Sequence, residues 1–225
     1  MTQDIWTVDS VLGPGAPVRM TVVKLPSGDL LLHSPTRYTP ALHSALARLG
    51  RIRHLIAPNI VHWMFARSWQ QALPDTRTWA APGLQRRKNV RRSGLRIDAE
   101  LADAAPSEWS DVIEQTVVRG GAGFTEVAMF HRPSRTLLLT DLVVNAEPAK
   151  VPWLIRPFAW ALGTLAPAGR PPAYLRAVIK ANRPEAAAAA ARILAWNPAR
   201  VLFAHGQPFG EDAADQLRRS LAWLA

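Results

Sequence analysis

Hydrophobic and polar residues alternate along the first part of the chain in a way that predicts short β-strands. Residues 18–24 alternate and are rich in β-branched side chains, residues 26–29 have the composition of a turn, and Leu30–Leu32 begins a second strand. Together these segments predict a β-hairpin. Further strands are expected at six short apolar segments: residues 53–57, 78–80, 112–118, 126–130, 136–140 and 201–204.

Helices are expected where apolar residues recur at helical spacing or where capping residues stand. Thr39 before Pro40 predicts a helix start, and Gly50 predicts its end after about Leu49. Residues 83–108 are basic and are expected to be irregular. Three further helical regions are predicted: residues 61–73, a set of segments between prolines in 151–195, and residues 210–224.

The order of these elements defines the expected fold class. Hairpins alternate with strand–helix units, which favours an α/β fold with a mixed sheet covered by helices. Neither an internal repeat nor a long linker is visible, so residues 1–225 are expected to form a single domain. The hydrophobic fraction of 48% and the charged fraction of 20% exclude a fibrous or a disordered protein.

Composition also limits the cellular context. The chain has no cysteine, which excludes disulfides, thiolate metal sites and a cysteine nucleophile. The acidic start, Met1 to Asp4, is followed by no apolar core, so we expect a cytoplasmic protein without a secretory signal. Residues 151–168 are the most membrane-like, but Arg156, Pro157 and Gly163 interrupt them, and a span needs about 20 apolar residues. A partly buried helix without membrane contact is expected there.

The net charge of +10 is concentrated in residues 85–96, which read QRRKNVRRSGLR. Such a run could attract an anionic small-molecule substrate, and a solvated surface segment is the alternative. No nucleic-acid-binding module accompanies the run, and the nine tryptophans are scattered, so a nucleic-acid partner is not expected. Nothing in the sequence specifies the oligomeric state.

Three short strands lead into side chains that can bind a metal. One strand leads through a turn to His62, a second runs into Asp141, and a third runs into His205. Residues beyond strand ends often converge on one site in layered α/β proteins. Two imidazoles and a carboxylate suit Zn²⁺, Fe²⁺ or Mn²⁺. The alternative is a hydrogen-bonded polar cluster without a metal.

The same segments resemble the metallo-β-lactamase-like superfamily. Residues 55–62 (LIAPNIVH) are similar to the segment carrying the motif H-x-H-x-D-H, with only His62 matching. In residues 121–145 Asp141 takes the place of the metal-bridging aspartate, and residues 201–206 are similar to the strand that bears the last histidine. The resemblance covers roughly residues 18–210 and points to a branch catalogued as a domain of unknown function. It implies a four-layered αββα sandwich with mixed sheets.

The resemblance implies that one of the two metal sites of the superfamily is lost. The first site uses three histidines, whose places are taken here by Ala57, Asn59 and Ala122. The second site keeps three of its four ligands: His62, Asp141 and His205. Three protein ligands and an open position are typical of a catalytic site with one metal.

Five further residues are candidates for supporting roles. The catalytic candidates are Glu126, as a general base or fourth ligand, and His33, which stands in the place of a superfamily aspartate and could orient a metal ligand. The alternatives are an ion pair for Glu126 and a satisfied strand-end position for His33. Asn59 could point its amide at the substrate or close a turn. Arg132 and Arg135 could bind an anion bidentately, or they could be surface charges of a hairpin.

Two functions follow from these features. The first is a mononuclear metal-dependent hydrolase of a small molecule, with one divalent ion (Zn, Fe or Mn) that activates water. The second is a catalytically inactive binding protein of the same fold that holds no metal. A basic protein associated with nucleic acid is a third, weaker alternative. The sequence does not specify the substrate.

Overall fold

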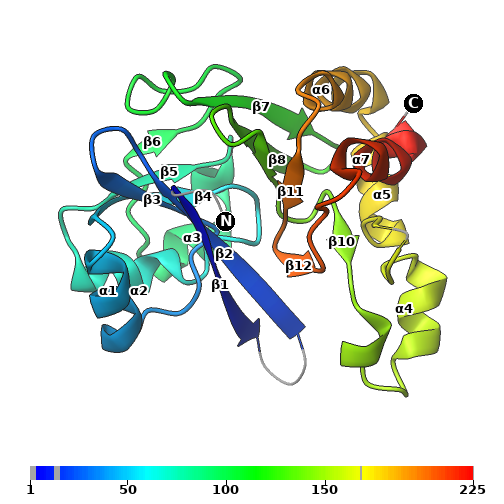
Figure 1. The fold of residues 1–225 in the computed structure, drawn as a ribbon, viewed down its shortest axis with the longest axis horizontal. Helices are drawn as coiled ribbons and strands as arrows, with labels where there is room; N and C mark the ends of the chain where they lie inside the picture. Colours follow the sequence, from blue (N-terminus) through cyan, green and yellow to red (C-terminus); the bar gives the residue numbers. More distant parts are fainter. Residues whose placement is uncertain (1–3, 13–15, 168, 225) are drawn as a thin grey trace.

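The computed structural model describes residues 4–12, 16–167 and 169–224 (Figure 1). Residues 1–3, on which the expected lack of a signal partly rests, and Ala168 lie outside the described residues. The strands are β1 (Ile5–Leu12), β2 (Ala16–Lys24), β3 (Asp29–His33), β4 (Arg51–Ala57), β5 (Arg77–Ala80), β6 (Ala99–Glu100), β7 (Ile113–Arg119), β8 (Thr125–His131), β9 (Thr136–Leu138), β10 (Val144–Asn145), β11 (Arg200–Leu202) and β12 (His205–Gly206). The α-helices are α1 (Pro40–Ala47), α2 (Ala66–Ala72), α3 (Lys88–Ser93), α4 (Arg156–Leu162), α5 (Ala173–Lys180), α6 (Arg183–Ala195) and α7 (Ala213–Leu221), and the short 3-10 helices are η1 (Leu84–Arg86), η2 (Pro148–Lys150) and η3 (Ala222–Leu224).

The strands form two main mixed sheets. The first sheet has the order β1-β2-β3-β4-β5-β6, the second has the order β11-β9-β8-β7, and β10 pairs with β12. In the first sheet β1, β2 and β3 pair antiparallel, while β3, β4, β5 and β6 pair parallel. In the second sheet β11 and β9 pair parallel, and the other pairs are antiparallel. Mixed sheets are what the alternation of hairpins and strand–helix units predicts.

Alternate side chains of one strand enter different layers of the core. On β3, Leu31 packs between the two sheets, whereas Leu30 and Leu32 pack on the helix side with Trp69 of α2. Successive side chains of a strand point to opposite faces, so a strand buried on both faces is an almost continuous apolar run. This explains why the short apolar segments predicted the strands.

Helices cover the outer face of each sheet. Figure 1 shows α1 and α2 beside the first sheet, and α5, α6 and α7 beside the second sheet. The buried face of α6 is made of Ala186, Ala189, Ala190 and Ile193, which pack in one cluster with Phe130 of β8. Small side chains let a helix approach a sheet closely. The molecule is therefore a sandwich of helix, sheet, sheet and helix layers, which confirms the expected α/β class.

Two expected segments have different structures. The helix expected over 61–73 is only α2, because the side-chain oxygen of Asn59 accepts the N–H groups of Val61 and His62 and holds a turn there. Residues 83–108 contain η1, α3 and β6 rather than irregular chain only. The many arginines in this segment made it look irregular in the sequence, but Val90 and Leu95 pack in a small buried cluster.

The helix expected after residue 151 is exposed over most of its surface, with only Ala159 and Leu162 half-buried. Helix α4 forms there, but none of its described residues is buried. It lies at the lower right edge of the molecule in Figure 1, away from both main sheets. Among the described residues, we find no helix with the length and apolar character that crossing a membrane requires.

Candidate metal centre

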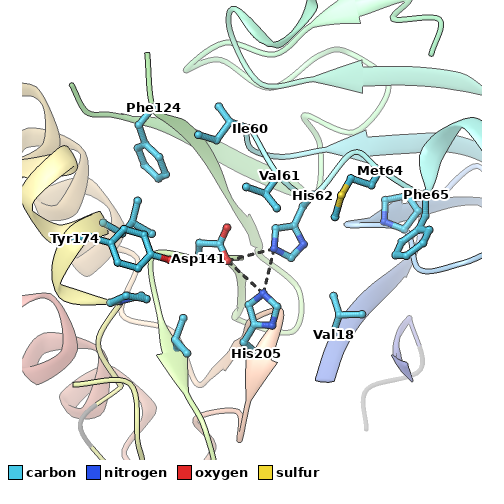
Figure 2. A pocket seen from close by; sticks show the side chains of 14 residues that line it. Val18, Ile60, Val61, His62, Met64, Phe65, Phe124, Asp141, Tyr174 and His205 are labelled. Atoms are coloured by element: carbon cyan, nitrogen blue, oxygen red, sulfur yellow. Dashed lines mark hydrogen bonds and ion pairs between the residues drawn. The ribbon is translucent and has the colours of Figure 1, made fainter. Parts of the chain in front are cut away.

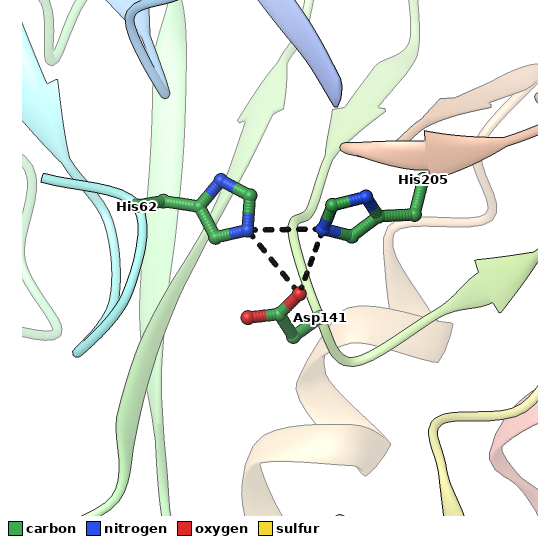
Figure 3. Close-up of side chains that lie close together, drawn as sticks. All are labelled: His62, Asp141 and His205. Carbon is green, nitrogen blue, oxygen red and sulfur yellow. Dashed lines mark hydrogen bonds and ion pairs between the residues drawn. The ribbon is translucent and has the colours of Figure 1, made fainter. Parts of the chain in front are cut away.

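Three side chains from distant parts of the sequence meet at one end of the sandwich (Figure 3). Oδ1 of Asp141 lies 3.2 Å from Nε2 of His62 and 3.3 Å from Nε2 of His205. The two imidazole Nε2 atoms are 3.3 Å apart. His62 follows β4, Asp141 follows β9, and His205 begins β12, so the ends of three strands supply the three groups.

The imidazole of His205 is fixed by backbone groups of β2 and β12. Its Nδ1 lies 2.8 Å from the carbonyl oxygen of Pro17. A carbonyl can only accept, so Nδ1 carries the hydrogen, and loss of the proton on Nε2 would leave its lone pair facing the other two residues. Gly206 has a φ of +96°, and a Cβ at this position would lie 2.0 Å from the carbonyl oxygen of Asn145. Only glycine therefore allows β12 to pair with β10 at this point.

The imidazole of His62 is fixed by a turn and a serine. Oδ1 of Asn59 accepts the backbone N–H of His62 at 2.8 Å, which sets the direction of the residue. Nδ1 of His62 lies 2.7 Å from Oγ of Ser34, which follows β3 with a φ of 56°. A hydrogen-bond partner on the far nitrogen is a common feature of metal-binding histidines.

The carboxylate of Asp141 is positioned by two buried polar side chains. Nδ2 of Asn59 donates to Oδ2 of Asp141 at 2.7 Å. Glu126 accepts the backbone N–H groups of Thr140, Asp141 and Leu142 at 2.7, 2.9 and 3.1 Å. These bonds hold the turn after β9 so that Oδ1 of Asp141 faces the two histidines.

The electrostatics of the cluster favour a cation between the three groups. Burial would raise the pKa of Asp141, but the charge of His62 and the hydrogen bond from His205 hold it well below its usual range. Burial would lower the pKa of His205, yet the hydrogen bond and the charge of Asp141 raise it above its ordinary value. An ionised carboxylate and two imidazole nitrogens thus face one another at close range.

The spacing of the three donor atoms fits a divalent ion. Metal–ligand bonds of about 2.0–2.1 Å in a tetrahedral arrangement separate neighbouring ligand atoms by about 3.3–3.4 Å. The three distances of 3.2, 3.3 and 3.3 Å agree with this spacing. Nitrogen and carboxylate donors are also the ligands that Zn²⁺ and Fe²⁺ prefer. The donor set and the fixed ring orientations therefore fit the metal that the sequence resemblance implies.

The cluster lies at the base of a cavity of about 430 Å³ (Figure 2). Phe124 and Tyr174 form one wall, and Met64 and Phe65 lie on the opposite side. Figure 2 shows the hydroxyl end of Tyr174 directed toward Asp141. Among the described residues that line the cavity, none is a lysine or an arginine. The cavity therefore offers apolar walls and one polar base.

The catalytic candidates of the sequence do not reach this cavity. Glu126 is fully buried, and its carboxylate oxygens accept backbone N–H groups of the Asp141 turn. His33 is also buried on β3, where burial, followed by the charge of His62, lowers its pKa to about 3. Neither side chain lines the cavity, because both are buried and the carboxylate of Glu126 faces the backbone after β9. Burial and the charge of Asp141 raise the pKa of Glu126, and the backbone hydrogen bonds partly offset this.

The substrate-binding candidates also have other partners. Asn59 uses both ends of its amide within the turn and toward Asp141, so it does not point at the cavity. Arg132 donates to the backbone oxygens of Ser110 and Asp111, and Arg135 donates to that of Asn197. Both arginines follow the end of β8 that is remote from Glu126, so the structure does not bring them to the site.

The basic segment lies beside the cavity wall without lining it. Arg87 donates to the carbonyl oxygen of Gly123 at 3.0 Å, next to Phe124 of the wall. Its neighbours Lys88 and Arg92 are exposed on α3. Whether the segment attracts a substrate stays a prediction.

Sequence reasoning missed several residues that shape the site. Pro17 contributes only a backbone oxygen, for which a sequence carries no signal. Ser34 has a signal, since it stands directly after a strand, at the kind of position that supplied the other candidates. Phe124 and Tyr174 are ordinary apolar positions in the sequence, and only the fold brings them to one cavity.

Solved metallo-β-lactamases share this architecture. The enzyme from Pontibacter korlensis superposes with a TM-score of 0.65 at 12% identity, covering 100% of this chain and 96% of that chain. The enzyme from Hirschia baltica gives 0.61 at 14% identity, covering 96% and 93%. The mono-zinc form of FIM-1 from Pseudomonas aeruginosa gives 0.62 at 14% identity, covering 96% and 90%. Identities this low show the fold alone.

The protein therefore has a divergent metallo-β-lactamase-like fold, as the resemblance of its strand ends implies. It belongs to the family described as Domain of unknown function (DUF4336), whose match covers residues 2–205. No curated protein matches the chain in sequence.

Proposed function

We propose that the protein is a mononuclear metal-dependent hydrolase whose single divalent ion is held by His62, Asp141 and His205. The observation that carries this proposal is the triangle of donor atoms, with sides of 3.2–3.3 Å, at the base of a cavity. When bound, an ion such as Zn²⁺, Fe²⁺ or Mn²⁺ supplies an activated water and polarises the bond to be cleaved.

The buried residues around the triad act by positioning in this proposal. Ser34 and the Pro17 carbonyl oxygen orient the two imidazole rings. Asn59 and Glu126 orient the carboxylate of Asp141, and they transfer no proton to a substrate. A site held in place before the substrate arrives loses less free energy to reorganisation during the reaction.

The cavity favours an uncharged substrate with an apolar part. An anionic substrate was expected from the basic segment and from Arg132 and Arg135, but none of these residues lines the cavity. Placing an unpaired charge against Phe124, Met64 and Leu175 carries a desolvation cost, whereas burying methylene groups there is favourable. We therefore propose a carboxylic ester or thioester with an apolar acyl group as the substrate class.

The reaction of such an ester with water requires no oxidant or reductant. The water oxygen forms a bond to the acyl carbon, the bond from this carbon to the leaving oxygen or sulfur breaks, and one proton of the water ends on the leaving group. The apolar walls keep other water away from the acyl group while this happens.

The second candidate function is a binding protein without a metal. The observation that favours it is the loss of the other metal site, where Ala57 and Ala122 offer no ligand. In this case a proton shared between Asp141 and the two histidines takes the place of the ion, and the apolar cavity binds a ligand without changing it.

Zinc titration and hydrolysis together distinguish the two functions. We expect calorimetry to give one Zn²⁺ per chain and the zinc-loaded protein to hydrolyse p-nitrophenyl butyrate faster than bis(p-nitrophenyl) phosphate. Asp141→Ala removes the only carboxylate of the triad and should abolish both zinc binding and hydrolysis. His43→Ala on α1 is the matched control and should change neither. If the unchanged protein binds none of Zn²⁺, Mn²⁺ and Fe²⁺ at neutral pH, the hydrolase is excluded and the binding protein remains.

A further inference from the structure

An apolar surface projects from the molecule next to the cavity and has no role in the proposed hydrolysis. It consists of five large side chains, which we call the 153–160 patch: Trp153, Leu154, Ile155, Phe158 and Trp160. Trp153 is 72% exposed and Trp160 is 75% exposed, and no residue of α4 is buried. Single exposed apolar residues are common on proteins, but a run of five large ones marks an interaction surface.

Backbone hydrogen bonds join the two ends of the projecting segment, residues 147–165, which we call the excursion. Ala146 donates its N–H to the carbonyl oxygen of Thr164 at 2.9 Å, and Ala166 donates to the carbonyl oxygen of Ala146 at 2.9 Å. The chain between these points leaves the body of the molecule and returns, as α4 at the edge of Figure 1 shows. The excursion thus holds the patch on the outside of the molecule. The exposed patch side chains contribute no packing to the hydrophobic core.

The charges around the patch identify its partner. Glu147 pairs with Lys150 at 2.7 Å at the start of this region, and residues 148–182 contain no further aspartate or glutamate but the five cations Lys150, Arg156, Arg170, Arg176 and Lys180. Apolar side chains that include tryptophan, mixed with an excess of cations over acids, match an anionic lipid surface. Tryptophan in particular is enriched at the boundary between headgroups and acyl chains.

A second copy of the chain is a poorer partner for the same surface. A two-fold interface would place the patch of one copy against the patch of the other. Arg156 would then be brought close to the cations beside the patch of the other copy, and like charges repel. The headgroups of an anionic bilayer instead provide opposite charges for the same residues.

We propose that the 153–160 patch docks the protein on the surface of an anionic lipid bilayer, without spanning it. The position of the patch relates this docking to the cavity. Val144 lines the cavity just before the excursion, and Pro172 and Tyr174 line it just after. A docked protein therefore holds its apolar cavity close to the lipid surface. The docking itself requires neither a metal nor catalysis.

Vesicle sedimentation tests the proposal on the full-length protein. The probes are vesicles of phosphatidylcholine with 30% phosphatidylserine, and vesicles of phosphatidylcholine alone. We expect binding to the anionic vesicles, weaker binding in 0.5 M NaCl, and a blue shift of tryptophan fluorescence on binding. Replacing one apolar side chain of the patch by serine should lower the affinity for vesicles by about tenfold or more. Replacing one cation by glutamine should lower it by about fivefold.

The variants are chosen on exposed positions so that the fold is retained. Trp153→Ser with Trp160→Ser removes the apolar contact, and Lys150→Gln with Arg156→Gln removes two cations of the excursion. Arg91→Gln with Arg92→Gln on α3 is the matched charge control and should bind vesicles as the unchanged protein does. Circular dichroism checks that every variant is folded.

Three results would overturn the proposal. The first is no sedimentation with anionic vesicles, and the second is equal binding by the double tryptophan variant. The third is a stable dimer in solution that the tryptophan substitutions dissociate, without any vesicle binding. None of these results bears on zinc binding, so failure of the docking is separable from failure of the proposed function.

Discussion

Glu126 and Asn59 are buried polar residues that set the geometry of the candidate metal site. Glu126 accepts three consecutive backbone N–H groups, and Asn59 joins the turn before His62 to the carboxylate of Asp141. Buried carboxylates and amides are stable only when such bonds are complete. A change at either residue should therefore act on both stability and metal affinity.

Replacing Glu126 by glutamine tests whether this residue positions Asp141. The new amide presents a donor to N–H groups that need an acceptor, so we expect a loss of about 2–3 kcal/mol in the free energy of unfolding. The Asp141 turn should also move, and zinc affinity should fall by about tenfold or more in calorimetry.

The control for this change is Glu108→Gln. Glu108 pairs with Arg77 at the protein surface, with Oε1 and Nη1 2.6 Å apart. Surface pairs of this kind contribute about 0–1 kcal/mol. If the two variants had the same stability and the same zinc affinity, the positioning role of Glu126 would be disproved.

His33 predicts how stability depends on pH. Its pKa is about 3 in the folded protein, against an ordinary value of 6.5. Below pH 6.5 His33 is protonated in the unfolded chain but stays neutral in the folded protein. The free energy of unfolding therefore falls by up to about 1.4 kcal/mol for each pH unit between pH 6.5 and about pH 3.

Urea unfolding between pH 7 and pH 4 measures this slope. His33→Asn should flatten the loss of stability on acidification, whatever its effect at pH 7. The same replacement at His43, on the outer helix α1, should leave the slope unchanged. A slope that is equal in all three proteins would show that His33 does not resist protonation.

Strand β12 is the element on which the position of His205 depends. Gly206 has a left-handed φ of +96° and pairs with Asn145 on β10. The guanidinium of Arg19 on β2 also donates to the carbonyl oxygen of Gly206 at 2.8 Å. Contacts of β12 with β2 and β10 thus fix the position of His205.

Gly206→Ala should break this lock. The added Cβ would lie 2.0 Å from the Asn145 oxygen, so the pair β10–β12 must separate. We expect a loss of more than about 3 kcal/mol in unfolding free energy and loss of zinc binding. Gly83→Ala is the control, because Gly83 also has a positive φ of +78°, but no atom of the described residues beyond its chain neighbours lies within 4 Å of an added Cβ. It should lose only about 1 kcal/mol, and equal losses in the two variants would contradict this account of β12.

Elements with strong local signals could be predicted from the sequence. Thr39 caps α1, with its side chain accepting the N–H of Leu42 at 3.1 Å, as the Thr-Pro pair indicates. Strands β2, β3 and β4 could be predicted because both of their faces are buried. Strand β1 was missed because its polar residues Asp9 and Ser10 dilute the apolar pattern of an edge strand. Strands β10 and β12 have two residues each, too few for any pattern.

The site was predictable in part for a similar reason. His62, Asp141 and His205 stand at the ends of apolar strands, and strand ends of one sandwich meet. The direction of Glu126 was not predictable, because a carboxylate can face a cavity or a backbone turn, and only the path of the chain after β9 decides between them.

At the scale of the whole molecule, the two sheets depend on each other. The cluster between them joins Leu31 and Ile56 of the first sheet to Val127, Leu138 and Leu202 of the second. We therefore propose that residues 1–225 unfold as one unit. Circular dichroism and tryptophan fluorescence should give one coincident thermal transition, with equal calorimetric and van't Hoff enthalpies. Two separate transitions would mean that the halves are independent domains.

A crystal structure of the protein grown with Zn²⁺, with anomalous diffraction recorded at the zinc edge, tests the central claim most directly. The account predicts a single anomalous peak between Nε2 of His62, Oδ1 of Asp141 and Nε2 of His205, at about 2.0–2.2 Å from each atom. No peak at this position, or a peak held by other residues, would contradict the claim that these three side chains form a mononuclear metal site.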